Sequence, residues 1–506
     1  MDHVAHRRGN RPPGAGTRRS LFSGILSGAD DGVAPCCRAG LPPGTHQPRR
    51  PEFQAPRTPH PHGCHALAVV PACAPHGTAY CRGPARLARL DGGRAVNPST
   101  SSGQAQLPLQ GIRVADFGQV IAAPVTAQML GWLGAEVILV ETESRFTTRV
   151  WPPFADGEFG INQSGGFNLV NGNKLSCSLD LRLPDARELA KGIIRVSDVL
   201  VENYATGVME NLGLGYDEVK KLRPDIIYMS LGAFGRSGPF KNLTGFHSVI
   251  NLFSGLAAVT GYPGTHPRIM GGLIPDAFAG CYGVLAVLEA LYHRSRTGEG
   301  QFVEVSMTEA LTGMIPEAVT EYSLTGKEQP KTGNRDERKA PHGVFRCLGE
   351  EKWVAVSVET DAQFRALAQA TANPGWADDA RFVTLAARLE NQDALETLVQ
   401  QWTAGQKVAE VVAILQAAGV PAAPVSDSAE VLADPHLTER GFVAHVEHPV
   451  AGRRPVLSLP WAADGHRVDD LRPAPTFGQH NQWVLRELLQ VSDEEYERLV
   501  ATGAIG

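Results

Sequence analysis

A strand–helix–strand pattern that begins at residue 112 constrains the fold of this chain more than any other feature of its sequence. Residues 112–116 read as a buried strand, residues 124–132 as a helix that Gly134 ends, and residues 136–141 as a second apolar strand. Two strands joined by a helix within about 30 residues form a βαβ unit, which requires parallel strands and a right-handed crossover. The sequence therefore predicts a parallel sheet.

The alternation continues along the chain. Helices are predicted over 185–197, 216–222 and 280–294, and strands over 199–202, 226–230 and 301–306. Strands that alternate with helices indicate an α/β class, so we predict a large Rossmann-like domain with a parallel sheet over residues 107–334.

The phosphate-binding fingerprint of dinucleotide enzymes is missing from this domain. The first strand is followed by Phe117-Gly118-Gln119-Val120-Ile121, which is not GxGxxG, so a nicotinamide cofactor is disfavoured. Gly213-Leu214-Gly215 is an isolated GxG ahead of a helix and is better interpreted as a helix cap and turn.

The alternation of single strands and helices ends after Gly333. A hairpin is predicted from residues 344–348 and 353–357 around Gly349, followed by helical stretches to about residue 418. We therefore predict a smaller α+β domain over 335–445. Residues 446–506 are predicted to return to the large domain.

The first 106 residues do not share these patterns. Residues 1–100 contain 13 Arg, no Lys and 5 acidic residues, which gives this segment a charge of +8. Because the whole chain has a net charge of −6, the remaining residues carry −14. They also contain 14 Pro and 13 Gly, a level typical of disorder. We predict no fold before Leu107, because the segment is either a disordered extension or the product of a start codon placed too far upstream.

The composition of this segment disfavours three functions: metal binding, targeting and nucleic-acid binding. Its five cysteines lack the paired spacing of a metal site, and a targeting peptide would need a longer apolar stretch after Arg18-Arg19. A basic segment that binds nucleic acid would be expected to interleave aromatic residues or carry a motif. We therefore expect no metal site and no nucleic-acid partner.

The remaining composition bears on location. Cys177, Cys281 and Cys347 are far apart with no CxxC pair, which favours a reduced cytoplasmic compartment. No run of about 18 uncharged apolar residues occurs, so we expect no membrane association.

Four ordered stretches resemble the family III coenzyme A transferases, the CaiB–BaiF family. They are LPLQGIRVADFGQVIAAPVTAQMLGWLGAEVILVE from Leu107, VENYATGVMENLGL from Val201, PDAFAGCYGVLAVLEALYHRSRTGEGQFVEVSM from Pro275, and APTFGQHN from Ala474. The resemblance extends from Leu107 to the end of the chain. It implies a Rossmann-like large domain, a small domain, and an interlocked homodimer with active sites where domains and subunits meet.

The resemblance assigns Asp276 as the catalytic nucleophile. Before the resemblance is considered, Asp276 reads as the N-cap of an apolar helix that starts near Gly280, where the helix dipole would favour the ionised carboxylate. A carboxylate can attack an acyl-CoA thioester and then carry CoA as an aspartyl thioester. The family's reaction conserves the thioester bond, so we expect neither a metal nor a cofactor beyond the CoA substrate.

Other positions match those that contact CoA in the family. For Lys174 the alternative is a solvated loop lysine, and for Tyr204 a partly buried core aromatic. The substrate-binding residues implied by the resemblance are Gln119, Val120, Ile121, Ala122, Lys174, Asn203 and Tyr204.

The sequence also departs from the formyl-CoA members of the family. A basic residue that follows the equivalent of Glu141 in those members is missing here, as is another at Asn211, so phosphate contacts are expected from Arg145, Arg149 or Arg236. Their glycine-run loop is replaced by the charged stretch 333–343, which suggests a different acyl substrate. Succinyl-CoA or another small dicarboxylic thioester is expected from family habit.

The same fold also hosts α-methylacyl-CoA racemases, which move a proton between two bases on opposite sides of the substrate. In such a reaction Asp276 would be one base, and His247 is the only plausible second base in the sequence. In a transferase, His247 would be an additional substrate-binding residue. The alternative for His247 is a histidine packed beside residues 251–255.

Overall fold

The computed structural model describes residues 107–463 and 467–506. The predictions made for residues 1–106 lie outside the described residues. The domain boundaries given above remain predictions.

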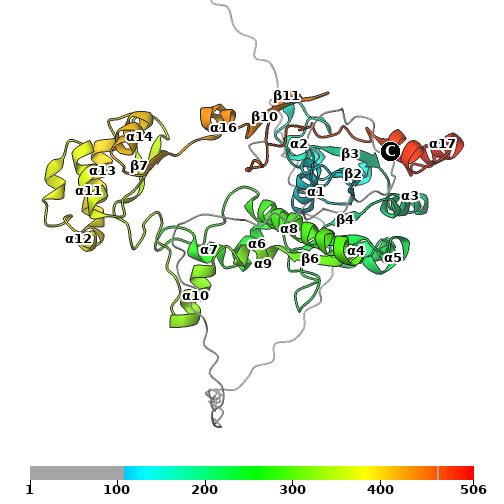
Figure 1. Ribbon diagram of the computed structural model, residues 1–506, viewed down its shortest axis with the longest axis horizontal. Helices are drawn as coiled ribbons and strands as arrows, with labels where there is room; N and C mark the ends of the chain where they lie inside the picture. Colours follow the sequence, from blue (N-terminus) through cyan, green and yellow to red (C-terminus); the bar gives the residue numbers. More distant parts are fainter. Residues whose placement is uncertain (1–106, 464–466) are drawn as a thin grey trace, which may run out of the picture. The chain divides into compact units, whose positions relative to one another are not determined.

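A six-stranded parallel sheet confirms the predicted α/β fold (Figure 1). Its order is β3-β2-β1-β4-β5-β6, and the order reverses between β1 and β4. Open α/β sheets form a crevice beyond the carboxyl ends of their strands at this reversal. The strands are β1 (Arg113–Asp116), β2 (Glu136–Glu141), β3 (Lys174–Ser178), β4 (Val199–Glu202), β5 (Ile227–Gly232) and β6 (Phe302–Ser306).

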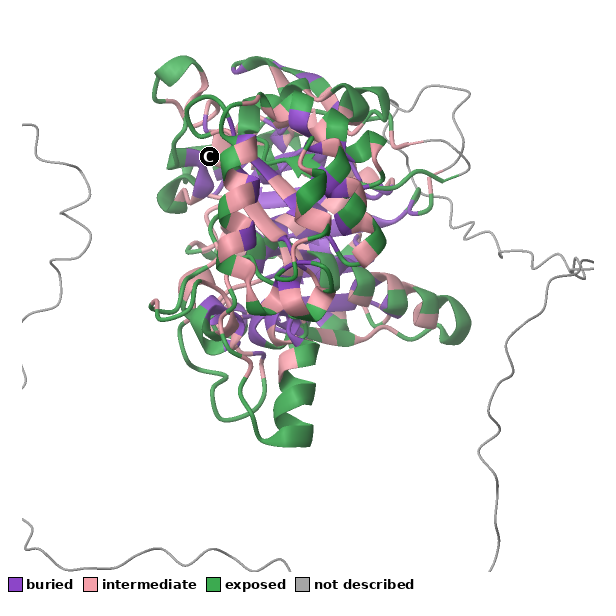
Figure 2. Ribbon diagram, turned by 90° about the vertical axis from the view of Figure 1, so that its left-hand side faces the viewer, coloured by how far each residue is buried: buried purple, intermediate pink, exposed green. Residues whose placement is uncertain are grey.

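Alternating side chains give the sheet two apolar faces. Val199 and Val201 point into one core cluster and Leu200 into the other. Figure 2 shows buried segments in purple at the centre, behind helices that mix green, pink and purple residues. The first face is covered by α1 (Ala122–Trp132), α6 (His247–Phe253), α8 (Ile274–Thr297) and α9 (Met307–Thr312), and the second by α3 (Pro184–Arg195), α4 (Val208–Asn211), α5 (Tyr216–Leu222), a π-helical turn (Trp483–Leu488) and α17 (Asp493–Ala501).

The packing of α8 on α1 depends on glycine. A Cβ atom at Gly280 would lie 2.9 Å from the carbonyl oxygen of Ala122, and one at Gly283 would lie 2.5 Å from Oγ1 of Thr126. Only a residue without a side chain permits this approach. Among the described residues, α8 is the one helix whose length and composition would suit a membrane span, but it packs along α1, β5 and β6 as a core helix does.

A separate core lies under a three-stranded antiparallel sheet. This sheet consists of β7 (His342–Arg346), β8 (Trp353–Ser357) and β9 (Ala422–Pro424). Its buried side chains pack with those of α11 (Asp361–Ala370), α13 (Gln392–Thr403) and α14 (Val408–Ala417). A second hairpin pairs β10 (Val443–His448) with β11 (Gly452–Leu457). The other helices are α2 (Gly165–Val170), α7 (Leu256–Val259), α10 (Pro316–Thr325), α12 (Leu385–Glu390), α15 (Ser428–Ala433) and α16 (Pro435–Glu439).

Candidate active site

The loops that follow β1 and β4 are joined at the reversal point of the sheet. The amide nitrogen of Gln119 donates to Oδ1 of Asn203 at 2.7 Å, and Nδ2 of Asn203 donates to the carbonyl oxygen of Gln119 at 2.8 Å. The structure therefore brings together two predicted CoA-binding residues that are 84 positions apart in the sequence.

Val120 has a strained backbone at the tip of the first loop. Its φ is +64°, in the left-handed region that β-branched residues rarely enter. Such a conformation costs on the order of 1–3 kcal/mol and persists where the surrounding structure imposes it, often at functional sites. Because Val120 is only half-buried, it presents this strained backbone at the crevice.

Ile121 and Ala122 do not reach the crevice with their side chains. Each is 1% exposed, and α1 begins at Ala122. No side chain caps the start of this helix, so the backbone amides of its first turn are not used by a capping side chain. Ile121 and Ala122 could therefore contact a ligand only through their backbone. Of the four predicted loop residues, Gln119 and Val120 line a cavity, whereas the side chains of Ile121 and Ala122 belong to the core.

Lys174 is not a solvated loop lysine. Its side chain is fully buried in β3, and Nζ donates to Oδ2 of Asp116 at 2.8 Å, to the carbonyl oxygen of Pro124 at 2.9 Å and to Oδ1 of Asn171 at 2.9 Å. Burial lowers the pKa of Lys174, and the charge of Asp116 opposes this effect. All three ammonium protons are committed beneath the loop, so Lys174 supports the loop; its contact with the nucleotide stays a prediction.

Asp116 extends this support to the loop backbone. Its Oδ1 accepts from the amide nitrogen of Gly118 at 2.7 Å. A Cβ atom at Gly118 would lie 2.7 Å from the same oxygen, so glycine is required there. The buried ion pair thus fixes the first residues of the crevice.

Tyr204 is held by the end of β4. Its amide nitrogen donates to Oε2 of Glu202 at 2.7 Å, and its hydroxyl accepts from Nε2 of Gln119 at 3.4 Å. Burial raises the pKa of Tyr204 to about 12, although the nearby charge of Arg145 lowers it. Tyr204 packs against the second core cluster, as expected for a partly buried aromatic, and its contact with CoA stays a prediction.

Of the three arginines proposed to meet phosphate, only Arg145 has an uncommitted guanidinium. Arg149 is 1% exposed and pairs with both carboxylate oxygens of Glu141 at 2.6 and 2.7 Å, and Arg236 pairs with Glu202 at 3.0 Å. Arg145 is exposed, its guanidinium makes no hydrogen bond or ion pair within the described residues, and it lies 5.7 Å from the centroid of the Tyr204 ring.

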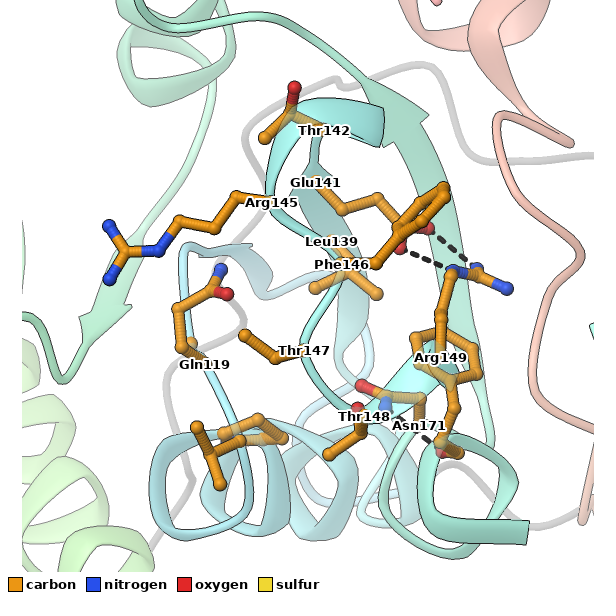
Figure 3. A pocket seen from close by; sticks show the side chains of 14 residues that line it. Gln119, Leu139, Glu141, Thr142, Arg145, Phe146, Thr147, Thr148, Arg149 and Asn171 are labelled. Atoms are coloured by element: carbon orange, nitrogen blue, oxygen red, sulfur yellow. Dashed lines mark hydrogen bonds and ion pairs between the residues drawn. The ribbon is translucent and has the colours of Figure 1, made fainter. Parts of the chain in front are cut away.

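Arg145 and Gln119 lie on the same side of a small cavity of about 30 Å³, with Arg149 and Glu141 opposite (Figure 3). The cavity adjoins the loop after β1 and the segment after β2. Its lining residues are Gly118, Gln119, Val120, Pro124, Leu139, Glu141, Thr142, Arg145, Phe146, Thr147, Thr148, Arg149, Phe167 and Asn171.

Asp276 lies in the first turn of α8 and is not its N-cap. The helix begins at Ile274, six residues earlier than predicted, because Pro275 is well suited to a first helical turn. Asp276 is 9% exposed, and its Oδ2 has no hydrogen-bond partner among the described residues. Burial raises the pKa of Asp276, so desolvation outweighs the effect expected from the helix dipole.

His247 belongs to the same site as Asp276. It is half-buried at the start of α6, and its charge lowers the pKa of Asp276 against the effect of burial. One turn after Asp276, Gly280 contacts the backbone of Ala122 at the start of α1. The structure therefore places the first turns of α8, which carry Asp276, beside the start of α1, which follows Gln119 and Val120.

Sequence reasoning missed Asp116 and Glu202, which hold the two loops from below. Each is the last residue of a buried strand, and an acidic residue at the carboxyl end of a parallel strand is a signal that could have identified them. Within residues 107–463 and 467–506, no group of three or more His, Cys, Asp or Glu side chains could hold a metal ion.

Comparison with known proteins identifies relatives that match most of this chain. Residues 109–481 match the family model described as CoA-transferase family III. The chain is 32% identical over 411 residues to the succinyl-CoA–D-citramalate CoA-transferase of Chloroflexus aurantiacus, which covers 80% of this chain and 100% of that protein. It is 30% identical over 384 residues to the succinate–glutarate CoA-transferase of Agrobacterium fabrum, which covers 75% of this chain and 96% of that protein.

A solved structure supports the same relationship. The crystal structure of a CaiB/BaiF family protein from Brucella suis matches with a TM-score of 0.70 and 30% sequence identity, covering 76% of this chain and 100% of that one.

Proposed function

This chain belongs to CoA-transferase family III, and we propose that it moves CoA from an acyl-CoA donor to a carboxylic acid through a covalent thioester on Asp276. The observation that carries the proposal is a buried carboxylate with an unpartnered oxygen in the first turn of α8, next to a histidine and to the loop after β1. Buried polar groups normally have partners, and an exception at a crevice indicates a functional group.

The proposed reaction begins with two exchanges on the donor. A carboxylate oxygen of Asp276 attacks the thioester carbonyl, and the carbon–sulfur bond breaks. This step releases CoA as a thiolate and leaves a mixed anhydride between the acyl group and Asp276. The thiolate then attacks the aspartyl carbonyl, which releases the donor acid as a carboxylate and leaves an aspartyl-CoA thioester.

The acceptor reverses these steps. Its carboxylate attacks the aspartyl thioester, releases the CoA thiolate and forms a second mixed anhydride. The thiolate attacks the acceptor's acyl carbon, and Asp276 leaves as a carboxylate. One thioester is consumed and one is formed, so the reaction needs neither ATP nor a metal.

For the substrates, we propose succinyl-CoA or a similar small dicarboxylic thioester as the donor. The relatives from Chloroflexus aurantiacus and Agrobacterium fabrum are named for succinyl-CoA or succinate with a second carboxylic acid. Gln119, Val120, Asn203 and Tyr204 would contact CoA, and Arg145 would contact its phosphates as an exposed, uncommitted cation.

The substitution Asp276→Ala tests this proposal. We expect CoA transfer from succinyl-CoA to a panel of dicarboxylic acids to fall below detection, because the proposed anhydride cannot form without the carboxylate of Asp276. Asp276→Asn, which keeps the shape of the side chain, is expected to be equally inactive and to retain the parent melting temperature. Residual turnover above about one thousandth of the parent rate would exclude the covalent mechanism.

A second candidate function is racemase-type proton transfer, favoured by the proximity of His247 to Asp276. In deuterated buffer, a racemase would exchange the α-proton of a 2-methylacyl-CoA without any acceptor acid. A transferase would instead require the acceptor and leave the α-carbon unlabelled.

We also propose that a second copy of the chain completes the site. Large apolar side chains are exposed on two helices: Leu285 and Tyr292 on α8, and Tyr322 on α10. Exposed apolar surface of this extent is typical of subunit contacts. A cytoplasmic location is proposed because Cys177, Cys281 and Cys347 are free thiols.

A further inference from the structure

One stripe of α6 is buried against the helices that surround the proposed nucleophile. His247, Ile250, Asn251 and Ser254 follow the i, i+3, i+4, i+7 spacing of one helix face, and all are buried or half-buried. Of the residues between them, Val249, Leu252 and Phe253 are exposed and Ser248 is half-buried. Helix α6 packs on both α8 and α9, so this stripe faces those two helices (Figure 1).

Asn251 carries an unsatisfied amide at the centre of this stripe. The residue is 0% exposed, and neither Oδ1 nor Nδ2 has a hydrogen-bond partner among the described residues. By contrast, the amide of Asn203 makes two hydrogen bonds, and so does that of Asn481. A leucine would fill such a position without leaving polar atoms unpaired, so packing alone does not account for an asparagine here.

The chemistry that would satisfy Asn251 is found on the facing helix. Oδ2 of Asp276 is also buried and unpartnered, and an ionised carboxylate can only accept hydrogen bonds. Asn251 lies one turn after His247, whose charge acts on Asp276. An unpaired donor and an unpaired acceptor therefore lie on two packed helices, and the donor is one turn along the buried stripe from His247.

The need for a donor increases during the proposed reaction. Each attack on the acyl group of Asp276 converts its carbonyl oxygen into an oxyanion, which a fixed hydrogen-bond donor stabilises. The amide of asparagine remains neutral at any working pH, so it can donate to the carboxylate, the anhydride and the thioester alike.

We propose that Asn251 is a positioning residue whose Nδ2–H group donates to the acyl oxygen of Asp276 during CoA transfer. This inference rests on the proposed function of Asp276. Asn251 forms and breaks no covalent bond and transfers no proton; it orients the aspartyl group and stabilises the charge that develops on it.

The test compares Asn251→Leu with the parent full-length chain, using succinyl-CoA and an acceptor acid found for the parent. We expect kcat to fall about 10²-fold, the typical effect of losing one oxyanion donor, while KM for succinyl-CoA changes less than about threefold. Rapid quenching should find slower formation of the aspartyl-CoA adduct. The melting temperature should be equal to or above that of the parent, because a buried unpaired amide has been removed.

Two further variants separate this role from a structural one. Asn251→Gln keeps the amide and is expected to regain at least a tenth of the parent kcat. Ser254→Ala changes the same stripe one turn later, and its kcat should remain within about twofold of the parent.

A kcat within threefold of the parent for Asn251→Leu would overturn the inference. So would a lower melting temperature together with an activity loss that Asn251→Gln does not recover, because both results indicate packing alone. If the parent itself forms no adduct on Asp276, the proposed function fails; if the parent forms it and Asn251→Leu forms it at the same rate, only the role of Asn251 fails.

Discussion

The reactivity of Asp276 depends on a balance between burial and charge. Burial disfavours the carboxylate and raises its pKa, whereas the charge of His247 favours the carboxylate and lowers the pKa. Nucleophilic attack requires the ionised form, so activity should disappear as the pH falls through the pKa of Asp276. The net upward shift places this loss at a higher pH than for an ordinary aspartate.

Removing the charge of His247 should move the loss of activity to a still higher pH. In His247→Gln the opposing effect disappears, the pKa of Asp276 rises, and the acid limb of the kcat/KM profile should shift to higher pH. The profile of CoA transfer against pH measures this directly. His293→Gln, a histidine at the distant end of α8, serves as the control and should leave the limb in place. An unchanged limb, or one displaced to lower pH, in His247→Gln would show that its charge does not act on the nucleophile.

At the scale of single elements, the loop after β1 is held from below by a buried ion pair. Asp116 and Lys174 are fully buried, and they connect β1, β3, the start of α1 and the end of α2. Removing one partner of such a pair leaves an uncompensated buried charge, which typically costs about 3–5 kcal/mol.

Lys174→Met should therefore lower the free energy of unfolding by about 3–5 kcal/mol in denaturant titrations. Lys191→Met removes a more exposed ion pair with Glu188 on α3 and should change stability by less than about 1 kcal/mol. In the double variant Asp116→Asn, Lys174→Met, part of the loss should return because no buried charge remains. A single-variant loss no larger than that of Lys191→Met would contradict the structural role assigned to Lys174.

Among the strands of the parallel sheet, those with apolar sequences could be predicted from the sequence. β1, β2, β4, β5 and β6 were all predicted from apolar runs, but β3 was not. Its sequence, Lys-Leu-Ser-Cys-Ser, alternates apolar with polar residues, and the polar positions are satisfied by distant groups. Thus Nζ of Lys174 donates to Oδ2 of Asp116, and the hydroxyl of Ser176 donates to Oε1 of Glu141.

The candidate site divides in a similar way. The positions of Asp276, Gln119 and Asn203 followed from the resemblance, whereas the burial of Lys174 and Arg149 did not. A lysine or arginine in a polar stretch reads as exposed because its carboxylate partner lies far away in the sequence. Asn251 was likewise hidden, because an asparagine within a short helix carries no signal of its own burial.

At the scale of the whole molecule, the proposed second copy should cover the exposed side of α8. Leu285 is 62% exposed at the middle of this helix, and it follows Asp276 by nine residues. An interface built on such residues would keep water away from apolar surface and bring a second chain close to the nucleophile.

Sedimentation of the full chain should therefore give twice the chain mass of 54.1 kDa. Leu285→Glu places a charge in the proposed interface, so it should shift the protein toward the monomer and reduce transfer activity in parallel. Val500→Glu, at an exposed apolar position on α17, is the matched control and should affect neither property. A monomeric parent, or an active dimer of Leu285→Glu, would argue against this interface.

The most direct test of the account is to trap the proposed thioester. The parent chain is incubated with succinyl-CoA in the absence of an acceptor, treated with hydroxylamine and analysed by peptide mass spectrometry, with Asp276→Asn treated in the same way. The account predicts a hydroxamate on Asp276 of the parent and none in the variant. Active transfer by the parent without any modification of Asp276, or with the modification on another residue, would contradict it.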